Sequence, residues 1–197
     1  MATQNDPALA EDQDLVRAAL REPKAYALIV RRYEAPLKRY IGRLLGTSSP
    51  SIEDVLQEAF IKAYVNLNDY DQRRRFSPWL FRIAHNEAHS LLRKQRTGPR
   101  VISGEEGLLL LERLTEGNDA RTDLDLARDE ERVRAALTDL DKRYRDVMIL
   151  RSLEDRNYED ISDILELPMG TVATLISRGK QQLRRALGER GVAGEDG

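Results

Sequence analysis

Donor side chains recur at helical spacing in the segment 76–96, FSPWLFRIAHNEAHSLLRKQR. At about 100° per residue, the opposite side of such a helix is mostly apolar, and one side holds Arg82, His85, Asn86, His89, Arg93 and Arg96. Guanidinium, imidazole and amide groups hydrogen bond to phosphates and base edges. The pattern therefore predicts an amphipathic helix whose exposed polar stripe binds nucleic acid. The alternative is a stripe that is only solvated.

Three consecutive arginines, Arg73 to Arg75, stand just before two aromatic residues, Phe76 and Trp79. Positive charge beside aromatic faces suits unstacked single-stranded bases, and stacking contributes roughly 1 to 3 kcal/mol per base. The same two rings would serve equally well as core residues. The pattern fits both interpretations.

His85 and His89 are the two histidines of the chain, and their i, i+4 spacing could hold a metal ion. The sequence HNEAH matches neither HExxH nor HxxEH, and no third ligand is evident. We therefore expect no metal and no other cofactor. A metal-dependent nucleic-acid hydrolase built on this pair is the minor alternative, and it would need acidic ligands nearby.

A contrasting surface is predicted for the helix that follows Ser51, its expected N-cap. The core stripe of this helix comprises Ile52, Val55, Leu56, Ala59 and Ala63. The opposite face comprises Asp54, Gln57, Glu58 and Ile61. Carboxylates with an apolar neighbour cannot bind phosphate and suit a basic protein partner, although a charged face is commonly just solvated.

The segment 158–187 combines a short helical pattern over 158–165, a tight break at Leu167 and Pro168, and a longer helical pattern over 169–187. The longer helix has an inward stripe of Val172, Ile176, Gly179, Leu183 and Leu187. The outward residues near its start are Thr171, Thr174, Ser177, Arg178 and Gln181. This arrangement is typical of a helix-turn-helix, whose second helix enters the major groove. An ordinary helical hairpin would show the same spacing.

The elements that carry these residues all have helical periodicity, and no stretch alternates with period two. Another helix is expected from Tyr26 to Leu44, ended by Gly46 and bent or split by Pro36. We therefore predict an all-α protein of two small helical domains, the second containing the helix-turn-helix. The expected parts are an acidic N-terminal tail (1–14), a first domain (15–96), an acidic linker (97–129), a second domain (130–190) and a C-terminal tail (191–197).

The charges are strongly segregated although the formal net charge is only −2. Residues 71–100 hold eight bases and two acids, whereas residues 101–130 hold three bases and nine acids. The absence of cysteine excludes a disulfide scaffold and a thiolate zinc finger. No apolar run approaches the roughly 20 residues that span a bilayer, and the acidic start lacks a signal core, so a soluble cytoplasmic protein is expected.

Three stretches in this order resemble the bacterial sigma factors of the extracytoplasmic-function (ECF) group: DVLQEAFIKAYVNL, FSPWLFRIAHNEAHSLLRKQR and NYEDISDILELPMGTVATLISRGKQQLR. The resemblance spans roughly residues 20–96 and 130–187. It implies a subunit without catalytic activity that binds core RNA polymerase, recognises the minus-10 and minus-35 promoter elements and supports strand opening. Its DNA would be both duplex and single-stranded non-template promoter, and an anti-sigma partner is common in the family.

The resemblance also implies roles for individual residues. The surface that docks on the clamp helices of the largest polymerase subunit would comprise Asp54, Gln57, Glu58 and Ile61. Minus-10 recognition and strand opening would involve Arg73, Arg75, Phe76, Trp79, Arg82, His85, Asn86, His89 and Arg93. The minus-35 element or its phosphates would be approached by Arg151, Tyr158, Thr171, Thr174, Ser177 and Arg178.

The chain departs from the family pattern in the stretch TVATLISRGK. The family usually has a basic stretch such as TVKSRLHRAR there, so Ala173 and Leu175 replace expected Lys or Arg. Each phosphate contact contributes about 0.9 to the slope of log affinity against log salt. With two such contacts absent, we expect the second domain to hold its element weakly or with unusual sequence preference, and its affinity to depend less steeply on salt.

A stand-alone helix-turn-helix regulator that binds operators as a dimer is the first alternative to this interpretation. It leaves the acidic face around Asp54 and Glu58, and the Phe76 and Trp79 pair, without a purpose. Co-purification with core polymerase separates the two hypotheses.

Overall fold

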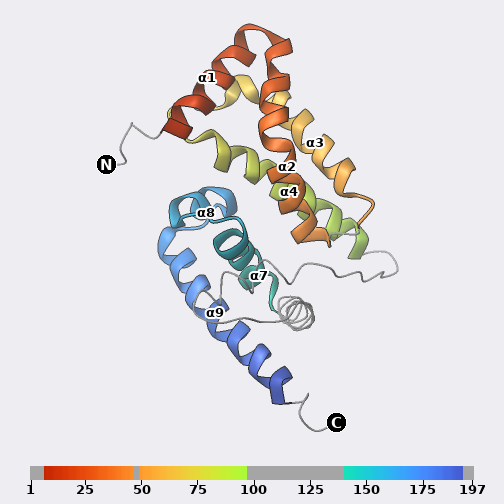
Figure 1. Cartoon of the computed structure of the whole chain (residues 1–197), viewed down its shortest axis with the longest axis vertical. Coiled ribbons are helices and arrows are strands. Elements are labelled where there is room, and N and C mark those ends of the chain that lie inside the picture. The colour runs from red at the N-terminus through yellow and green to blue at the C-terminus, as the bar shows by residue number, and fades with distance from the viewer. Residues whose placement is uncertain (1–6, 47–48, 97–139, 193–197) are drawn as a thin grey trace, which may run out of the picture. The chain divides into compact units, whose positions relative to one another are not determined.

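The computed structural model describes residues 7–46, 49–96 and 140–192 of the chain. Within these ranges all regular elements are helical, which confirms the predicted all-α class. The helices form two compact units, the first made by α1 to α4 and the second by α7 to α9 (Figure 1). The predicted acidic linker, including the apolar run Leu108 to Leu111, lies outside the described residues.

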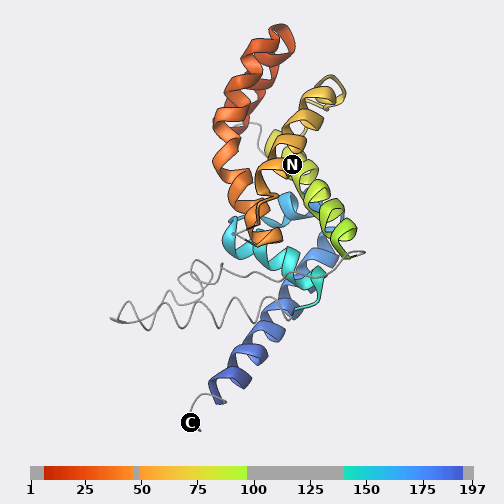
Figure 2. The same cartoon turned by 90° about the vertical axis from the view of Figure 1, so that its right-hand side faces the viewer.

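In the first unit α2 (Tyr26–Leu45), α3 (Ile52–Val65) and α4 (Phe76–Arg96) all pack against one another (Figures 1 and 2). The predicted core stripe of α3 is buried, and Ala59 and Ala63 are fully inaccessible. Ser51 occupies the N-cap but its side chain makes no capping hydrogen bond. Gly46, with φ at 94°, ends α2 in a conformation that favours glycine.

Pro36 lies inside a single helix, so the predicted alternative of a split α2 is wrong. A proline in a helix interior removes one backbone hydrogen bond and costs about 3 kcal/mol. In α2 this cost is opposed by a continuous buried face on both sides of the proline, formed by Ile29, Tyr33, Leu37, Tyr40 and Ile41. Burial of one such large side chain contributes about 1.5 to 3 kcal/mol.

The N-terminal segment differs from the expectation. Residues 7–14, expected to belong to an acidic tail, are part of α1 (Pro7–Arg21), which packs against α2 and α4. Val16 and Ala19 are buried, and so is the carboxylate of Asp12. The partners of Asp12 lie on α2, which no local pattern in the first 20 residues reveals.

The second unit contains the predicted helix-turn-helix. Helix α8 (Tyr158–Leu165) is capped by Asn157, whose side-chain oxygen accepts from the Asp160 amide at 2.7 Å. Glu166 then takes a left-handed conformation, with φ at 54°, and α9 (Met169–Val192) begins after Pro168. The inward residues Val172, Ile176 and Leu183 are buried as predicted.

Helix α7 (Lys142–Met148) and the π-helical turn η3 (Ile149–Leu153) complete the second unit, with α7 packed against α9. Gly179 marks the tightest approach, because a Cβ there would lie 3.0 Å from Met148 Cγ and 3.6 Å from Tyr144 Cβ. A larger side chain would therefore collide with a fully buried Met148.

Gly179→Leu is expected to destabilise the second unit by about 1 to 3 kcal/mol, the usual cost of overpacking. Thermal unfolding of the full chain, followed by helical circular dichroism, measures this effect. Gly170→Leu is the matched control, because nothing lies within 4 Å of a Cβ at Gly170 on the same helix. Equal unfolding temperatures for the two variants would contradict the close packing of α7 on α9.

Candidate protein and nucleic-acid interfaces

The acidic face of α3 consists of Asp54, Gln57, Glu58 and Ile61, and all four side chains are exposed. Ile61 keeps 49% of its surface accessible. Glu53 and Asp54 stand in the first turn of α3, where the positive end of the helix dipole favours carboxylates. Glu58 lies 3.6 Å from Lys62 on the same helix, an exposed pair that leaves the carboxylate accessible.

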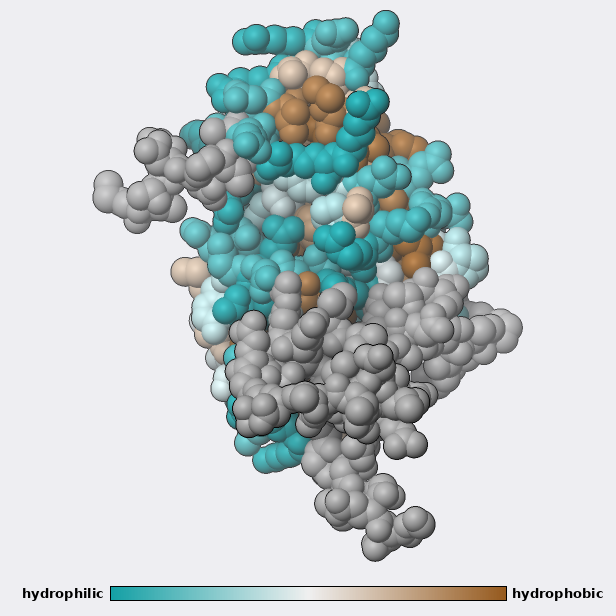
Figure 3. Space-filling view, viewed as in Figure 1, coloured by the Kyte–Doolittle hydropathy of each residue, from teal (hydrophilic) through white to brown (hydrophobic). Residues whose placement is uncertain are grey.

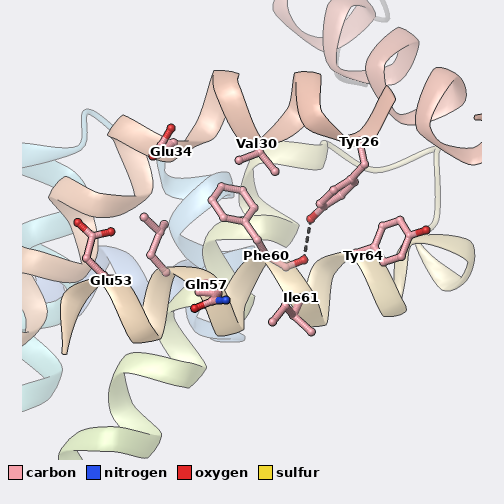
Figure 4. A pocket seen from close by; sticks show the side chains of 9 residues that line it. Tyr26, Val30, Glu34, Glu53, Gln57, Phe60, Ile61 and Tyr64 are labelled. Atoms are coloured by element: carbon pink, nitrogen blue, oxygen red, sulfur yellow. Dashed lines mark hydrogen bonds between the residues drawn. The ribbon is translucent and has the colours of Figure 1, made fainter. Parts of the chain in front are cut away.

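An apolar groove runs between α2 and α3 beside this acidic face, with a volume of about 490 Å³ (Figure 4). Gln57 and Ile61 belong to both the groove and the acidic face. The remaining lining residues are Tyr26, Val30, Glu34, Glu53, Leu56, Phe60 and Tyr64. In the space-filling view, hydrophobic residues surface among hydrophilic ones on the first unit (Figure 3).

The groove has fixed walls and one charged end. Tyr26 donates a hydrogen bond to the Phe60 carbonyl at 2.8 Å, and its ring meets that of Tyr64 edge-on at 5.0 Å. The two tyrosines stand at one end, whereas Glu34 and Glu53 stand at the other (Figure 4). Because Glu53 is ion-paired with Lys38, the groove suits mainly an apolar segment of a partner protein.

Phe76 is a core residue, which agrees with the second of the two interpretations that its position allowed. Only 1% of its surface is accessible, and its ring is packed edge-on against Tyr33 at 5.7 Å and Tyr70 at 5.3 Å. Trp79 is half-buried and packs against the same aromatic cluster, with its ring centroid 5.0 Å from that of Tyr70 and 5.4 Å from that of Phe76. Of the two predicted rings, Trp79 alone offers an accessible surface.

His85 and His89 are buried, which contradicts their place in the predicted exposed stripe. The Nδ1 atom of His85 lies 2.8 Å from the Tyr40 hydroxyl, and the two rings are stacked. The His89 ring meets the His85 ring at 4.2 Å. An imidazole can be buried in a core when it has a hydrogen-bond partner there. For His85 that partner is Tyr40, which is 45 residues away in the sequence, so local spacing could not reveal it.

The other donors of α4 and its preceding loop remain at or near the surface. Asn86 and Arg93 are exposed, and Arg75 and Arg82 are partly exposed. Arg73 is exposed and forms a two-pronged ion pair with Asp71, at 3.0 and 3.1 Å. These hydrogen bonds lower the pKa of Asp71 below its usual value.

Glu87 of α4 is half-buried and paired with Lys62 of α3 at 2.8 Å. The ion pair links α4 to α3 and raises the pKa of Lys62. Sequence spacing could not identify this partner, because it lies on another helix.

The outward side of α9 carries Thr171, Thr174, Ser177 and Arg178, all of them exposed. Two more residues of the predicted minus-35 set, Arg151 and Tyr158, contact each other. The Arg151 guanidinium lies over the Tyr158 ring, 5.8 Å from the ring centroid. Arg151 also donates to the Arg156 carbonyl at 3.2 Å, which fixes its side chain in η3. Tyr158 keeps 44% of its surface accessible.

The two residues of α9 that replace the Lys or Arg expected from the family pattern differ in burial. Ala173 is exposed, whereas Leu175 is buried with 9% of its surface accessible. A residue buried in this way does not leave a vacant phosphate contact on the outward surface. Of the two positions, only Ala173 lies on the outward surface where the expected basic side chain would reach a phosphate.

No helix among the described residues is long and apolar enough to cross a membrane. Residues 29–97 match the Sigma-70 region 2 family, and residues 130–183 match the Sigma-70 region 4 family. The first match covers most of α2 with all of α3 and α4, and the second covers α7, α8 and the first part of α9.

Curated relatives agree over most of the chain. The ECF RNA polymerase sigma factor SigW of Bacillus subtilis (strain 168) is 34% identical over 170 residues, covering 83% of this chain and 89% of SigW. The RNA polymerase sigma-H factor of Pseudomonas aeruginosa is 32% identical over 187 residues, covering 90% and 94%.

A solved structure of CnrH in complex with the cytosolic domain of CnrY is 26% identical to this chain, with a TM-score of 0.66. It covers 90% of this chain and 97% of CnrH. The two region matches together with the SigW relationship establish the family. The chain belongs to the ECF sigma factors, the initiation subunits that bind core RNA polymerase and direct it to promoters without catalysing a reaction themselves.

Proposed function

We propose that the acidic face of α3 and the adjoining groove together bind the clamp helices of the largest polymerase subunit. The exposed carboxylates of Asp54 and Glu58 supply attraction to a basic helix, and Ile61 supplies an apolar contact where the two surfaces meet. The groove continues this surface onto α2 and offers room for apolar side chains of the same partner.

Minus-10 DNA is contacted by the basic loop before α4 and by the outer side of α4. The accessible Trp79 stacks on an unstacked non-template base, and the surrounding cations hold the backbone. The residues proposed for this contact are Arg73, Arg75, Trp79, Arg82, Asn86 and Arg93. Phe76, His85 and His89 support these residues from inside the domain.

Minus-35 DNA is contacted by the N-terminal half of α9. Thr174 donates its hydroxyl hydrogen to the Gly170 carbonyl at 2.9 Å, so its oxygen remains to accept from a base or from water. Arg178 has the reach and the five donors for a guanine or a phosphate. The full proposed set is Arg151, Tyr158, Thr171, Thr174, Ser177 and Arg178.

Residues 7–96, which include α1, and residues 130–190 form the two working domains of this proposal, and residues 97–129 link them. The protein acts in the cytoplasm, where polymerase and DNA are found. A structural neighbour, the sigma factor RpoE from Bartonella quintana, was solved in complex with the anti-sigma factor NepR, and we propose that an anti-sigma factor also masks this chain.

The single observation that carries the proposal is the exposure of an acidic face on α3 and a donor surface on the neighbouring α4. One domain can thereby hold polymerase and promoter at the same time. Run-off transcription with purified core enzyme on a promoter library tests this function. Initiation at defined start sites supports it, and no initiation at any site would sink it.

Arg178→Ala is expected to weaken binding to a minus-35 duplex by roughly 1 to 3 kcal/mol if the guanidinium contacts a base. Fluorescence anisotropy of the polymerase holoenzyme on labelled promoter duplexes measures the change. Arg185→Ala, an exposed charge two turns further along α9, is the matched control for a general loss of positive charge. Equal losses in both variants would argue against a specific contact by Arg178.

A further inference from the structure

Asp12 is a buried carboxylate in the first helix, with 7% of its surface accessible. It accepts a hydrogen bond from the Tyr33 hydroxyl at 2.5 Å and lies 3.0 Å from Nε of Arg32. Burial raises the pKa of Asp12 against the opposing effects of Tyr33 and Arg32. A carboxylate is costly to bury, so its presence at this point in α1 calls for an explanation beyond helix packing.

Tyr33 connects Asp12 to the aromatic cluster that supports Trp79. The Tyr33 ring packs edge-on against Phe76 at 5.7 Å, and its hydroxyl is also hydrogen bonded with the Ser77 side chain. Phe76 in turn contacts Trp79 at 5.4 Å. Asp12 therefore fixes the hydroxyl end of a ring that touches the first two residues of α4.

A second link ties α1 to the basic loop before α4. The side-chain amide of Gln13 donates to the Gln72 carbonyl at 3.0 Å. The same loop is closed on itself by a hydrogen bond from the Tyr70 hydroxyl to the Arg74 carbonyl. Tyr70 also contacts Trp79 at 5.0 Å. Helix α1 is therefore connected to the residues around Trp79 by two routes, one through Tyr33 and one through this loop.

We propose that α1 is a working part of the strand-opening apparatus, and that Asp12 is a positioning residue which holds Tyr33, Phe76 and thereby Trp79 in the orientation that captures a base. Residues 7–21 precede the segment that matches Sigma-70 region 2, so this helix adds a support that the matched region does not include. The inference rests on the proposed role of Trp79 in strand opening. A Trp79 ring that is already held in its binding orientation loses less conformational entropy when it captures a base.

Asp12→Ala is the first test, with Asp14→Ala as the matched control, because the Asp14 side chain is 77% exposed on the same helix. Each full-length variant is assembled with core polymerase and assayed on a duplex promoter and on the same promoter with a pre-melted minus-10 region. Asp12→Ala is expected to slow initiation on duplex DNA about tenfold, in line with loss of a charged hydrogen bond, and less than twofold on pre-melted DNA. Asp14→Ala should match the parent on both.

The fluorescence of Trp79, the single tryptophan of the chain, gives a second readout. Asp12→Ala should shift its emission to longer wavelength as the cluster loosens, whereas Asp12→Asn, which keeps an acceptor for Tyr33, should restore both emission and initiation. Tyr33→Phe removes only the hydroxyl and should reproduce the Asp12→Ala defect without adding to it in the double variant. This milder variant keeps the test decisive if Asp12→Ala fails to fold.

Equal losses on duplex and pre-melted templates, or no loss in either Asp12→Ala or Tyr33→Phe, would overturn the proposal while leaving the strand-opening role of Trp79 intact. A parent protein that cannot open duplex promoters with core polymerase would overturn the proposed function itself, and this inference with it.

Discussion

Asp54→Lys combined with Glu58→Lys is expected to weaken core polymerase binding at least about 100-fold, because like charges facing each other across an interface cost several kcal/mol. Both side chains are exposed, so the fold does not depend on their burial. The change places a cation at residue 58 beside Lys62, which retains its ion pair with Glu87. Binding is measured by competition against a labelled sigma factor for core polymerase.

The matched control reverses two exposed carboxylates outside the acidic face, Glu22 and Asp69, to lysine. Both double variants change the net charge by the same amount. A specific docking surface predicts near-normal affinity for this control pair. If both pairs lose affinity equally, the effect is general electrostatics and α3 is not the docking element.

Trp79→Ala is expected to lower the yield of open complexes at least tenfold, because base–aromatic stacking contributes roughly 1 to 3 kcal/mol per base. Permanganate footprinting of unpaired thymines measures strand opening in the assembled holoenzyme. Binding to a minus-35 duplex should be unchanged, since the proposed contacts of that duplex lie in the second unit.

A core role for Trp79 would give a different result. Trp79→Phe keeps a stacking face and should recover much of the opening, whereas Phe76→Ala should lower the unfolding temperature because Phe76 is fully enclosed. If Trp79→Ala lowers the unfolding temperature as much as Phe76→Ala does, its effect on opening reflects the core and not a contact with DNA.

Local periodicity was sufficient for much of the fold. The core stripe of α3, the break around Pro168 and the inward side of α9 follow from residues within one helical turn of each other, which the sequence displays directly. The exposed outer side of α9 follows by the same geometry, because a residue about 180° from the buried stripe has no neighbour to cover it.

Long-range partners account for the failures. His85 is buried and hydrogen bonded with Tyr40, and Asp12 is buried and accepts a hydrogen bond from Tyr33. Both tyrosines lie on another helix. A helical wheel of α4 alone places His85 among the surface residues, because it cannot show the Tyr40 hydroxyl that hydrogen bonds with His85 from 45 residues away. Phe76 was ambiguous for the same reason, since the rings that enclose it come from α2 and from the loop before α4.

The double use of α3 restricts how this protein can change over evolutionary time. Of its 14 residues, six are buried in the core, and most of the others line the groove or the acidic face. Most substitutions in α3 therefore change either a core residue or a residue of the surface that we propose binds polymerase. The outer side of α9, where we propose that DNA binds, consists of exposed side chains, so a substitution there can alter promoter preference without disturbing the core.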